Sequence, residues 1–417
     1  MKIAIIGTGI SGLTAAWRLC RTHDLTLFEA NDYVGGHTHT VEVEAGGQRH
    51  AVDTGFIVFN DWTYPNFIAL LEQLGVASQP TTMSFSVRCE RTGLEYNGES
   101  LNTLFAQRRN LFRPSFHRMI RDILRFNREA PALLDSHRDL SLDAWLREGH
   151  YSQEFTDQYI LPMAAAIWSA EPGIVGEMPA RFFVRFFRNH GLLSVNDRPQ
   201  WRVIRGGSRT YVEALTAPFR DRIRLNCPVE WVRRHPTHVQ VKPWGGPVER
   251  FDEVIIATHS DQALRLLADP ATREWEILGA IPYQENEVVL HTDTHLLPRR
   301  KRAWAAWNYH LPAQPRERVA VTYNMNILQG LDTSATLCVT LNRGEAIDPA
   351  HVLYRTTYHH PVFTEAGVRA QTRRDEISGV NRTWYCGAYW RYGFHEDGVN
   401  SGLAVARGLL EPGRLAA

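Results

Sequence analysis

Three glycines and one acid near the N-terminus have the types and the spacing that bind a phosphate-bearing cofactor. Gly7, Gly9 and Gly12 follow the apolar run at residues 3–6, and Glu29 lies seventeen residues after the last of them. The first glycine permits a tight turn, the second lets the backbone approach a pyrophosphate, and the third lets a helix pack closely on the strand. Free N–H groups at the start of the helix hold phosphate, while the acid accepts ribose hydroxyls. The spacing predicts a dinucleotide-binding site.

A second glycine-rich segment, YCGAYWRYGFHEDGVNSGLAVARGLL, occupies residues 385–410. Its glycines, Gly387 among them, let the backbone approach a flat ring, and we expect a helix from about Asn400 onward. The positive end of that helix would stabilise negative charge on a ring that takes up a hydride. The alternative interpretation is an ordinary buried terminal helix preceded by a glycine-rich loop.

These two segments need further elements to bring them together. The sequence predicts strand, helix and strand over residues 2–28, and a hairpin that leads into a buried strand at 254–257. Residues 64–169 are mostly helical in pattern. Residues 283–345 alternate as strands of a second, mostly antiparallel sheet. A short strand at 384–388 precedes the last helix.

The composition is that of an ordinary globular protein. The 417 residues carry a net charge of +1, which gives no reason to expect a nucleic acid partner. Five scattered cysteines without a Cys-x-x-Cys pair favour reduced thiols, and the histidines lack ligand spacing, so we expect no metal site. The chain starts on a cofactor-binding strand, and no apolar run reaches the roughly 18 residues of a membrane span. We therefore expect a cytoplasmic protein.

In order along the chain, these segments resemble FAD-dependent amine oxidases and phytoene-desaturase-like flavoproteins. The stretches GGHTHTV, DTGFIVFN and AWAAWNYH look more specifically like a bacterial branch of predicted FAD-binding oxidoreductases. That branch is associated with cyclopropane-fatty-acid-synthase-type methyltransferases and includes desaturases of methylated fatty acyl chains. The resemblance implies FAD as the cofactor.

The resemblance also implies an α/β fold: a Rossmann-like FAD-binding domain of the amine-oxidase (glutathione-reductase-like) type with a second, α+β substrate domain. The flavin domain is expected from residues 1–80, 200–275 and 376–417, and the substrate domain from residues 81–199 and 276–375. The residues expected to contact the cofactor are Gly7, Gly9, Ile10, Ser11, Gly12, Glu29, Ala30, Gly35, Gly36, His37, Thr38, Gly55, Phe56, Val229, Ala257, Gly387, Gly398, Val399 and Asn400.

Two positions depart from the pattern of the relatives. Many of them carry an arginine after the Gly-Gly turn, where this chain has His37. Amine oxidases of the family usually place a cage tyrosine where this chain has His395. Loss of that cage wall argues against amine oxidation but leaves FAD binding intact. If hydride abstraction needs a proton acceptor, the candidates are His395, Tyr309 and the flavin itself.

The sequence thus predicts an FAD-dependent oxidoreductase that transfers a hydride from an apolar substrate, most plausibly a fatty acyl chain, to flavin. Only one glycine-rich fingerprint is present, so electrons are expected to leave to oxygen, a quinone or another protein rather than to a nicotinamide. The alternatives are a flavin amine oxidase and a non-catalytic flavin-binding redox sensor.

A basic amphipathic helix is predicted after Pro114. Its apolar positions are Phe116, Met119, Ile120, Ile123 and Leu124, and the arginines near it are Arg108, Arg109, Arg113, Arg118, Arg121, Arg125 and Arg128. This pattern suits the anionic surface of a membrane through residues 108–128, at the inner membrane face. A surface helix with its apolar face on the core is the other interpretation.

Two weaker expectations concern aromatic and imidazole side chains. Trp304, Trp307 and Tyr309 are predicted on a strand that faces the flavin ring, either as core packing or as a substrate cage. His359 and His360, beside a proline, are predicted in a surface turn.

Overall fold

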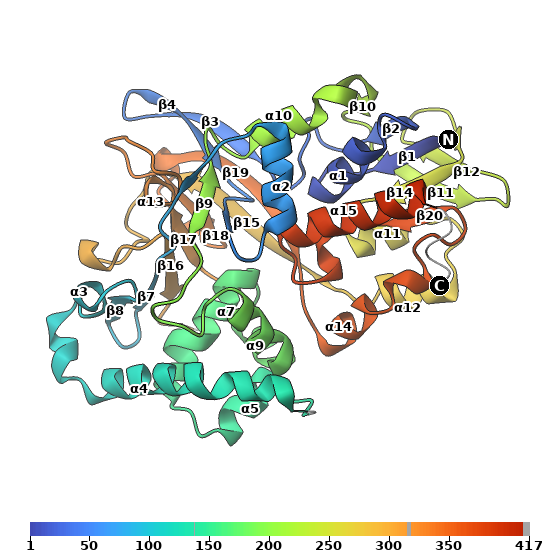
Figure 1. Cartoon of the computed structure of the whole chain (residues 1–417). Coiled ribbons are helices and arrows are strands. Elements are labelled where there is room, and N and C mark those ends of the chain that lie inside the picture. Colours follow the sequence, from blue (N-terminus) through green and yellow to red (C-terminus); the bar gives the residue numbers. More distant parts are fainter. Residues whose placement is uncertain (137, 315–317, 412–417) are drawn as a thin grey trace.

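A computed structural model describes residues 1–136, 138–314 and 318–411 of the chain (Figure 1). Parts of three predicted domain segments therefore lie outside the described residues: residue 137 of segment 81–199, residues 315–317 of segment 276–375, and residues 412–417 of segment 376–417.

Five strands form an all-parallel sheet near the N-terminus. In spatial order they are β10 (Ile223–Arg224), β2 (Asp24–Phe28), β1 (Lys2–Ile6), β14 (Glu253–Ile256) and β20 (Thr383–Tyr385). A parallel sheet needs cover on both faces, and side chains alternate between those faces along a strand. On β1, Ile3 and Ile5 pack with the N- and C-terminal helices, whereas Ala4 and Ile6 pack in a separate cluster.

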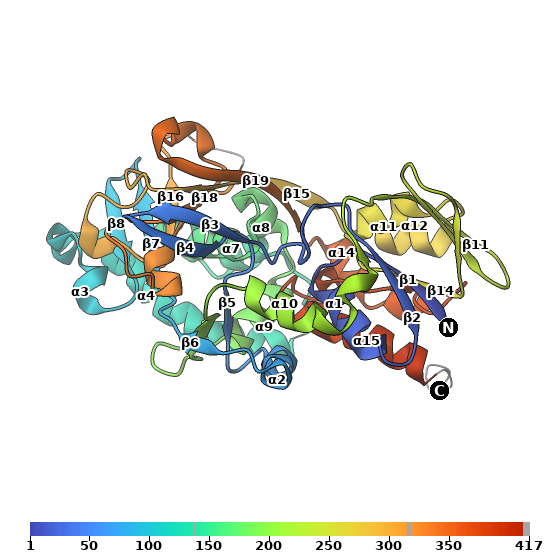
Figure 2. The ribbon, with the colours of Figure 1, turned by 90° about the horizontal axis from the view of Figure 1, so that it is seen from above.

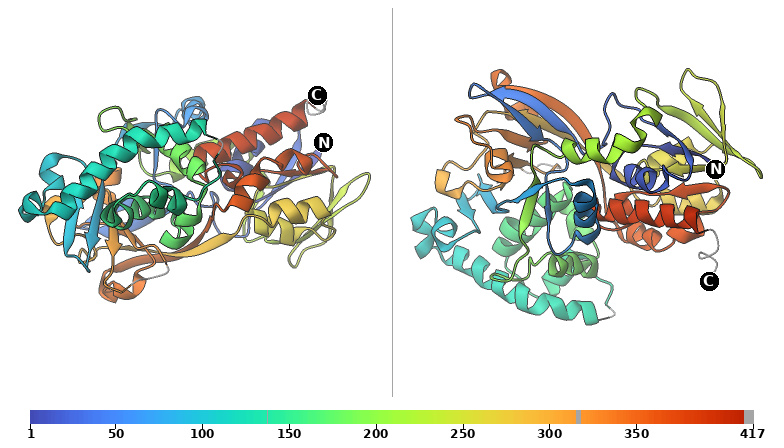
Figure 3. Two further views of the ribbon diagram at one scale, coloured as in Figure 1. Left: turned by 90° about the horizontal axis from the view of Figure 1, so that it is seen from below. Right: turned by 45° about the horizontal axis from the view of Figure 1, so that its top comes forward.

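The elements that cover this sheet come from opposite ends of the chain. Helices α1 (Ile10–Leu19) and α15 (His395–Leu410) lie side by side (Figure 3). The other cluster is built by a small sheet and two helices: β11 (Val229–Arg234), β12 (Val239–Pro243), β13 (Glu249–Phe251), α11 (Ser260–Leu266) and α12 (Thr272–Leu278).

A seven-stranded mixed sheet forms the second large unit of structure. Its spatial order is β19 (Val352–Pro361), β15 (Tyr283–His291), β18 (Cys338–Leu341), β17 (Val321–Asn324), β16 (Trp307–Leu311), β7 (Phe85–Cys89) and β8 (Leu94–Asn97). Every neighbouring pair is antiparallel except β16 with β7. The parallel sheet and this mixed sheet together confirm the predicted fold class.

Two long strands of the mixed sheet extend toward the parallel sheet. Strands β15 and β19 pair along their length and reach toward the parallel sheet (Figure 2). The remaining strands are β3 (Thr40–Ala45), β4 (Gln48–Asp53), β5 (Val58–Asn60), β6 (Ser78–Pro80) and β9 (Trp201–Ile204). The remaining helices named α are α2 (Pro65–Leu74), α3 (Leu101–Leu104), α4 (Pro114–Glu129), α5 (Leu142–Glu148), α6 (Gln153–Phe155), α7 (Leu161–Trp168), α8 (Pro172–Glu177), α9 (Ala180–Asn189), α10 (Arg209–Thr216), α13 (Met325–Gln329) and α14 (Glu365–Gln371).

Helix α4 begins at Pro114 as predicted, but its apolar face is not free. Phe116 and Met119 are buried, and Ile120 and Ile123 pack against the same core. Only Leu124 of the predicted face is exposed. The helix therefore covers a core of aromatic side chains, as in the second of the two interpretations, and contact of residues 108–128 with a membrane stays a prediction. Among the described residues, no helix has the length and apolarity needed to cross a membrane.

Candidate active site

The turn between β1 and α1 has open space where a phosphate group would fit. Gly7 has φ of +100°, and a Cβ on Gly12 would overlap the carbonyl oxygen of Gly7. A Cβ on Gly9, in contrast, would meet nothing within 4 Å. Helix α1 has no side-chain cap and no acid in its first turn, so the N–H groups at its start are free to hold an anion.

Glu29 follows β2 and lies beside this turn. Its carboxylate accepts the backbone N–H of Thr8 at 3.0 Å and the backbone N–H of Asn31 at 2.9 Å, and the Thr8 hydroxyl donates to it as well. The Glu29 carbonyl accepts the N–H of Cys227, two residues before Val229 at the start of β11. Carboxylate oxygens have further lone pairs, so the fixed acid can still accept ribose hydroxyls. The adjacent Ala30 is exposed.

The Gly-Gly turn packs directly on the first turn. A Cβ on Gly36 would lie 3.1 Å from the Cα of Gly9, and Gly35 forms an isolated bridge with Gly9. Both glycines have positive φ. The chain then passes through His37 toward the cavity described next, so the Gly35-Gly36 turn connects the Gly7–Gly12 turn to that cavity.

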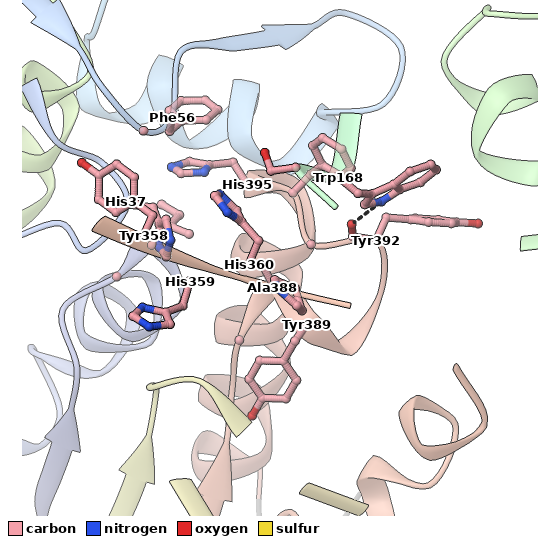
Figure 4. Close-up of a pocket in the computed structure, with 18 of the residues that line it drawn as sticks. His37, Phe56, Trp168, Tyr358, His359, His360, Ala388, Tyr389, Tyr392 and His395 are labelled. Atoms are coloured by element: carbon pink, nitrogen blue, oxygen red, sulfur yellow. Dashed lines mark hydrogen bonds between the residues drawn. The ribbon is translucent and has the colours of Figure 1, made fainter. Parts of the chain in front are cut away.

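One cavity of about 280 Å³ brings most of the predicted segments together (Figure 4). The predicted residues that line it are Gly9, Ile10, Ser11, Gly35, His37, Gly55, Phe56, Ala257, Gly387 and His395. The other predicted cofactor residues are absent from the lining that the structure describes: Gly7, Gly12, Glu29, Ala30, Gly36, Thr38, Val229, Gly398, Val399 and Asn400. Of these, Gly7, Gly12, Glu29 and Gly36 lie at the phosphate turn beside it.

The rest of the wall is mainly aromatic and aliphatic. It includes side chains that the sequence analysis missed, in particular Trp168, Tyr323, Tyr358, Phe363 and Tyr392. The Trp168 ring nitrogen donates to the carbonyl of Tyr392 at 3.2 Å and ties two of these segments together (Figure 4). Tyr358 could have been found from the alternation of its strand, but nothing in the sequence around Trp168 indicates the cavity.

No Asp, Glu, Lys or Arg lines the described cavity, and burial keeps four of its lining histidines neutral. Burial lowers the pKa of His37 to about 4, against a hydrogen bond with the backbone of His359 that raises it. Burial also lowers the pKa of His259 and of His360 to about 3 and that of His395 well below its usual range. At neutral pH these four imidazoles are therefore uncharged, and no carboxylate, ammonium or guanidinium group lines the described cavity.

Three buried polar atoms at the cavity have no hydrogen-bond partner among the described residues. They are His37 Nε2, Trp307 Nε1 and Tyr389 Oη, all on lining residues. Buried polar groups are normally satisfied, and an unpaired donor or acceptor costs free energy. Each of these three residues therefore carries one buried polar atom that the described residues leave unpaired.

The expected positions of two histidines and the last helix need correction. His359 and His360 lie in β19, not in a turn, because β19 pairs with β15 through both residues. Helix α15 begins at His395 rather than near Asn400. It begins earlier because the Asp397 carboxylate accepts the N–H groups of Tyr392 and Phe394, at 3.2 and 3.1 Å.

The early start gives Gly398 a packing position inside the helix. A Cβ there would lie 2.6 Å from Cγ2 of Ile10, so Gly398 lets α15 approach α1. Val399 is buried in the core, and the Asn400 side chain accepts a hydrogen bond from Asn66 at 2.8 Å. These residues set the place of the helix rather than the wall of the cavity.

The two expected catalytic side chains differ in their surroundings. Nε2 of His395 lies 3.0 Å from the Thr38 hydroxyl and 2.9 Å from the Tyr211 hydroxyl, and its ring stacks on Phe56 with centroids 3.4 Å apart. Tyr309 is buried near Phe85 and does not line the described cavity. Trp304, Trp307 and Tyr309 were predicted to face the flavin ring, and of these three only Trp307 lines the described cavity.

The model of the family described as flavin containing amine oxidoreductase matches residues 10–348. The chain belongs to this family. A relative from Mycobacterium tuberculosis, named as a flavin-containing monoamine oxidase, is 27% identical over 288 residues, which span 65% of this chain and 59% of the relative's length. A cyclohexylamine oxidase from Brevibacterium oxydans has a TM-score of 0.69 at 18% identity, with 99% of both chains covered. A fatty acid isomerase from P. acnes has a TM-score of 0.69 at 16% identity, with 97% of this chain and 98% of that chain covered. These two likenesses show the shared fold.

FAD is the cofactor of the family, and the residues of this chain fit it. The open space at Gly9 and the free N–H groups of α1 would hold the pyrophosphate, and Glu29 would hold the ribose. His37, whose buried Nε2 has no partner among the described residues, lines the cavity that the flavin ring would enter. The boundaries of the two domains remain a prediction.

Proposed function

We propose that this chain is an FAD-dependent oxidoreductase that oxidises a long, uncharged, apolar substrate of the fatty acyl class. The observation that carries the proposal is the absence of Asp, Glu, Lys and Arg from the described lining. A cationic amine would find no fixed counter-charge there, whereas an acyl chain needs mainly apolar contacts. The aromatic wall supplies those contacts.

The proposed reaction removes two hydrogens from neighbouring carbons and leaves a double bond. When bound, FAD would supply the acceptor for one hydrogen as a hydride and for the other as a proton, so that two electrons and two protons leave the substrate. An acceptor of the class of dioxygen or a quinone later takes the two electrons. The protein binds the chain, orients the reacting carbon and excludes water from it.

His37 is the polar side chain best placed to meet the reacting groups. Its buried Nε2 has no partner among the described residues, whereas Nε2 of His395 already lies within hydrogen-bond distance of two hydroxyls. The low pKa of His37, due to burial, keeps the imidazole neutral and able to accept a hydrogen bond. We therefore place His37 at the flavin and treat His395 as a residue that positions Phe56 and the start of α15.

Amine oxidation is the second candidate. It is favoured by the monoamine oxidase name of the 27% identical relative, of which this chain matches 59%. The uncharged cavity argues against it. Of the two, acyl oxidation agrees better with the lining residues.

Anaerobic reduction of the bound flavin tests the proposal. The FAD-loaded protein is mixed with methyl-branched and straight-chain phospholipids, a carotenoid and simple amines, and the loss of flavin absorbance is followed. The proposal predicts bleaching by an acyl lipid and none by the amines. Rapid bleaching by a simple amine, with none by any lipid, would reverse the order of the two candidates.

A further inference from the structure

A second cleft, of about 840 Å³, opens at the β7–β8 edge of the seven-stranded sheet. It lies away from the flavin cavity and shares none of its lining residues. Its charged lining residues are Arg88, Glu90, Glu95, Arg108, Arg109, Arg299, Arg300 and Arg302. Six arginines thus face two acids in one concave surface.

Both acids of the cleft already have partners. The Glu95 carboxylate is buried and accepts the backbone N–H groups of Arg299 and Arg300, at 2.9 and 3.0 Å. Glu90 accepts the N–H of Ala313 at 3.0 Å and lies 2.8 Å from His310. These hydrogen bonds fix the loop, but they do not pair the guanidinium groups that the loop presents.

Three guanidinium groups are left facing solvent. Arg299, Arg300 and Arg302 are exposed, and their side chains make no hydrogen bond or ion pair with any residue of the described ranges. Most arginines on helix α4 differ in this respect: Arg118 pairs with Glu154, and both Arg125 and Arg128 pair with Glu129. The cleft therefore brings three unpaired positive charges together on one short loop.

Large apolar side chains project beside the same cleft. Phe112 is 86% exposed, Leu101 76% and Leu111 46%. Phe112 and Leu111 end the 3₁₀ helix Arg108–Phe112, whose first two residues line the cleft. Leu101 begins α3, which contacts the 3₁₀ helix Lys301–Ala303 that follows Arg300. Apolar groups this exposed are a feature of surfaces that meet a partner.

We propose that this surface, the arginine cleft with Leu101, Leu111 and Phe112, docks on a bilayer of anionic phospholipid. The cleft arginines would contact headgroup phosphates, and the three apolar side chains would enter the boundary with the acyl chains. A nucleic acid or a free phosphate would match the arginines but would leave the apolar side chains without a role. The inference does not depend on the substrate proposed for the flavin cavity.

Vesicle co-sedimentation with the FAD-loaded full chain tests this inference. The vesicles are phosphatidylglycerol mixed with phosphatidylcholine, or phosphatidylcholine alone. The protein is expected to bind the anionic vesicles and to be released by salt. Each basic side chain near an anionic surface changes the partition coefficient about fivefold, so Arg299→Ala, Arg300→Ala and Arg302→Ala together should lower it roughly a hundredfold.

Matched variants separate this surface from general charge and general apolarity. Arg21→Ala, Arg205→Ala and Arg250→Ala remove the same charge from exposed sites elsewhere and should leave binding within about twofold. Phe112→Ser should weaken binding, whereas Trp244→Ser, at a 72% exposed site on the β12–β13 turn, should not. If the cleft triple variant does not fold, the Phe112→Ser and Trp244→Ser pair alone decides.

Four outcomes of the vesicle experiments would overturn the inference, and a fifth would come from a test with single-stranded DNA. They are binding that ignores lipid charge, an equal loss in the two triple variants, an equal loss in the two Ser variants, and release from vesicles by inorganic phosphate at low millimolar concentration, which would indicate a site for free phosphate. Binding to single-stranded DNA with none to anionic vesicles would assign the cleft to nucleic acid instead.

Discussion

Gly9 and Gly12 belong to one glycine spacing but have different physical roles. Gly9 has φ −67° and ψ 171°, which alanine also adopts, and its missing Cβ faces open space. Gly9→Ala should therefore leave the free energy of unfolding of the cofactor-free protein within about 0.5 kcal/mol. It should weaken FAD binding at least about tenfold, because the added methyl group occupies the place of the pyrophosphate.

Gly12→Ala provides the contrast for Gly9→Ala. Its Cβ would overlap the Gly7 carbonyl oxygen and lie 2.9 Å from Cβ of Ala257, so it should cost about 1–3 kcal/mol of stability even without cofactor. Urea unfolding and FAD titration separate the two effects. Equal FAD affinity in Gly9→Ala and the unchanged protein would mean that the pyrophosphate does not bind at this turn.

The neutral state of His37 predicts a pH dependence. Its pKa is about 4 in the folded chain, lowered by burial, and close to 6.5 when unfolded. Between these two pH values the unfolded chain binds a proton on His37 that the folded chain does not. The free energy of unfolding therefore decreases as the pH falls. The stability of the unchanged protein relative to His37→Gln should decrease by about 2 kcal/mol from about pH 7 to about pH 4.5.

Urea unfolding of both cofactor-free proteins at the two pH values measures this change. Asp53 and Asp397, whose pKa values burial raises to about 6 and about 7, contribute with the opposite sign but equally in both proteins. A difference in stability that does not change with pH would mean that His37 titrates normally in the folded chain.

Single residues were predictable where the chemistry needs a fixed local spacing. Gly9 and Glu29 are separated by one helix and one strand, so their relation follows from the sequence. Trp168 and Tyr392 were not predictable as cavity residues, because they meet across a long separation in the chain. Tyr309 does not line the described cavity, although Trp307, two residues earlier on the same face of β16, does.

At the scale of elements, the close approach of α15 to α1 holds the two glycine-rich segments together. A Cβ on Gly402 would overlap the carbonyl oxygen of Ser11. Gly402→Ala should therefore cost about 1–3 kcal/mol of stability and also reduce FAD retention, since α1 would shift. Gly173→Ala, in α8 with nothing within 4 Å of its Cβ, should be neutral or slightly stabilising.

Thermal unfolding and gel filtration with FAD check both variants. Equal behaviour of Gly402→Ala and Gly173→Ala would mean that the two helices do not need this contact.

Elements were predictable where a periodic pattern is long, and their ends or exposed faces were not. The β1–α1 unit and the start of α4 follow from apolar runs and Pro114. The start of α15 was predicted about five residues too far along the chain. Nothing in the glycine-rich sequence indicated that the Asp397 carboxylate accepts two backbone N–H groups there. The face of α4 was open to two interpretations, because periodicity gives an apolar stripe without its partner.

At the scale of the whole molecule, the cavity is built from segments at both ends of the chain and from its middle. Gly9 and Gly387 come from the flavin-binding sheet region, and Trp307, Tyr323 and Leu341 come from the mixed sheet. The sequence resemblance could predict that these regions meet. The absence of charged side chains from the described lining depends on which side chains of each strand face inward. That direction is known only from the structure.

The central claim, an FAD site that serves an uncharged apolar chain, is tested most directly by a matched pair of substrates. The FAD-loaded protein is mixed anaerobically with a long-chain fatty acyl ester and with an amine of the same chain length, and flavin absorbance is followed by stopped flow. The account predicts bleaching by the ester at a rate at least about tenfold above that with the amine, because the cavity offers the ammonium group no counter-charge. Faster bleaching by the amine, with the ester inert, would contradict it.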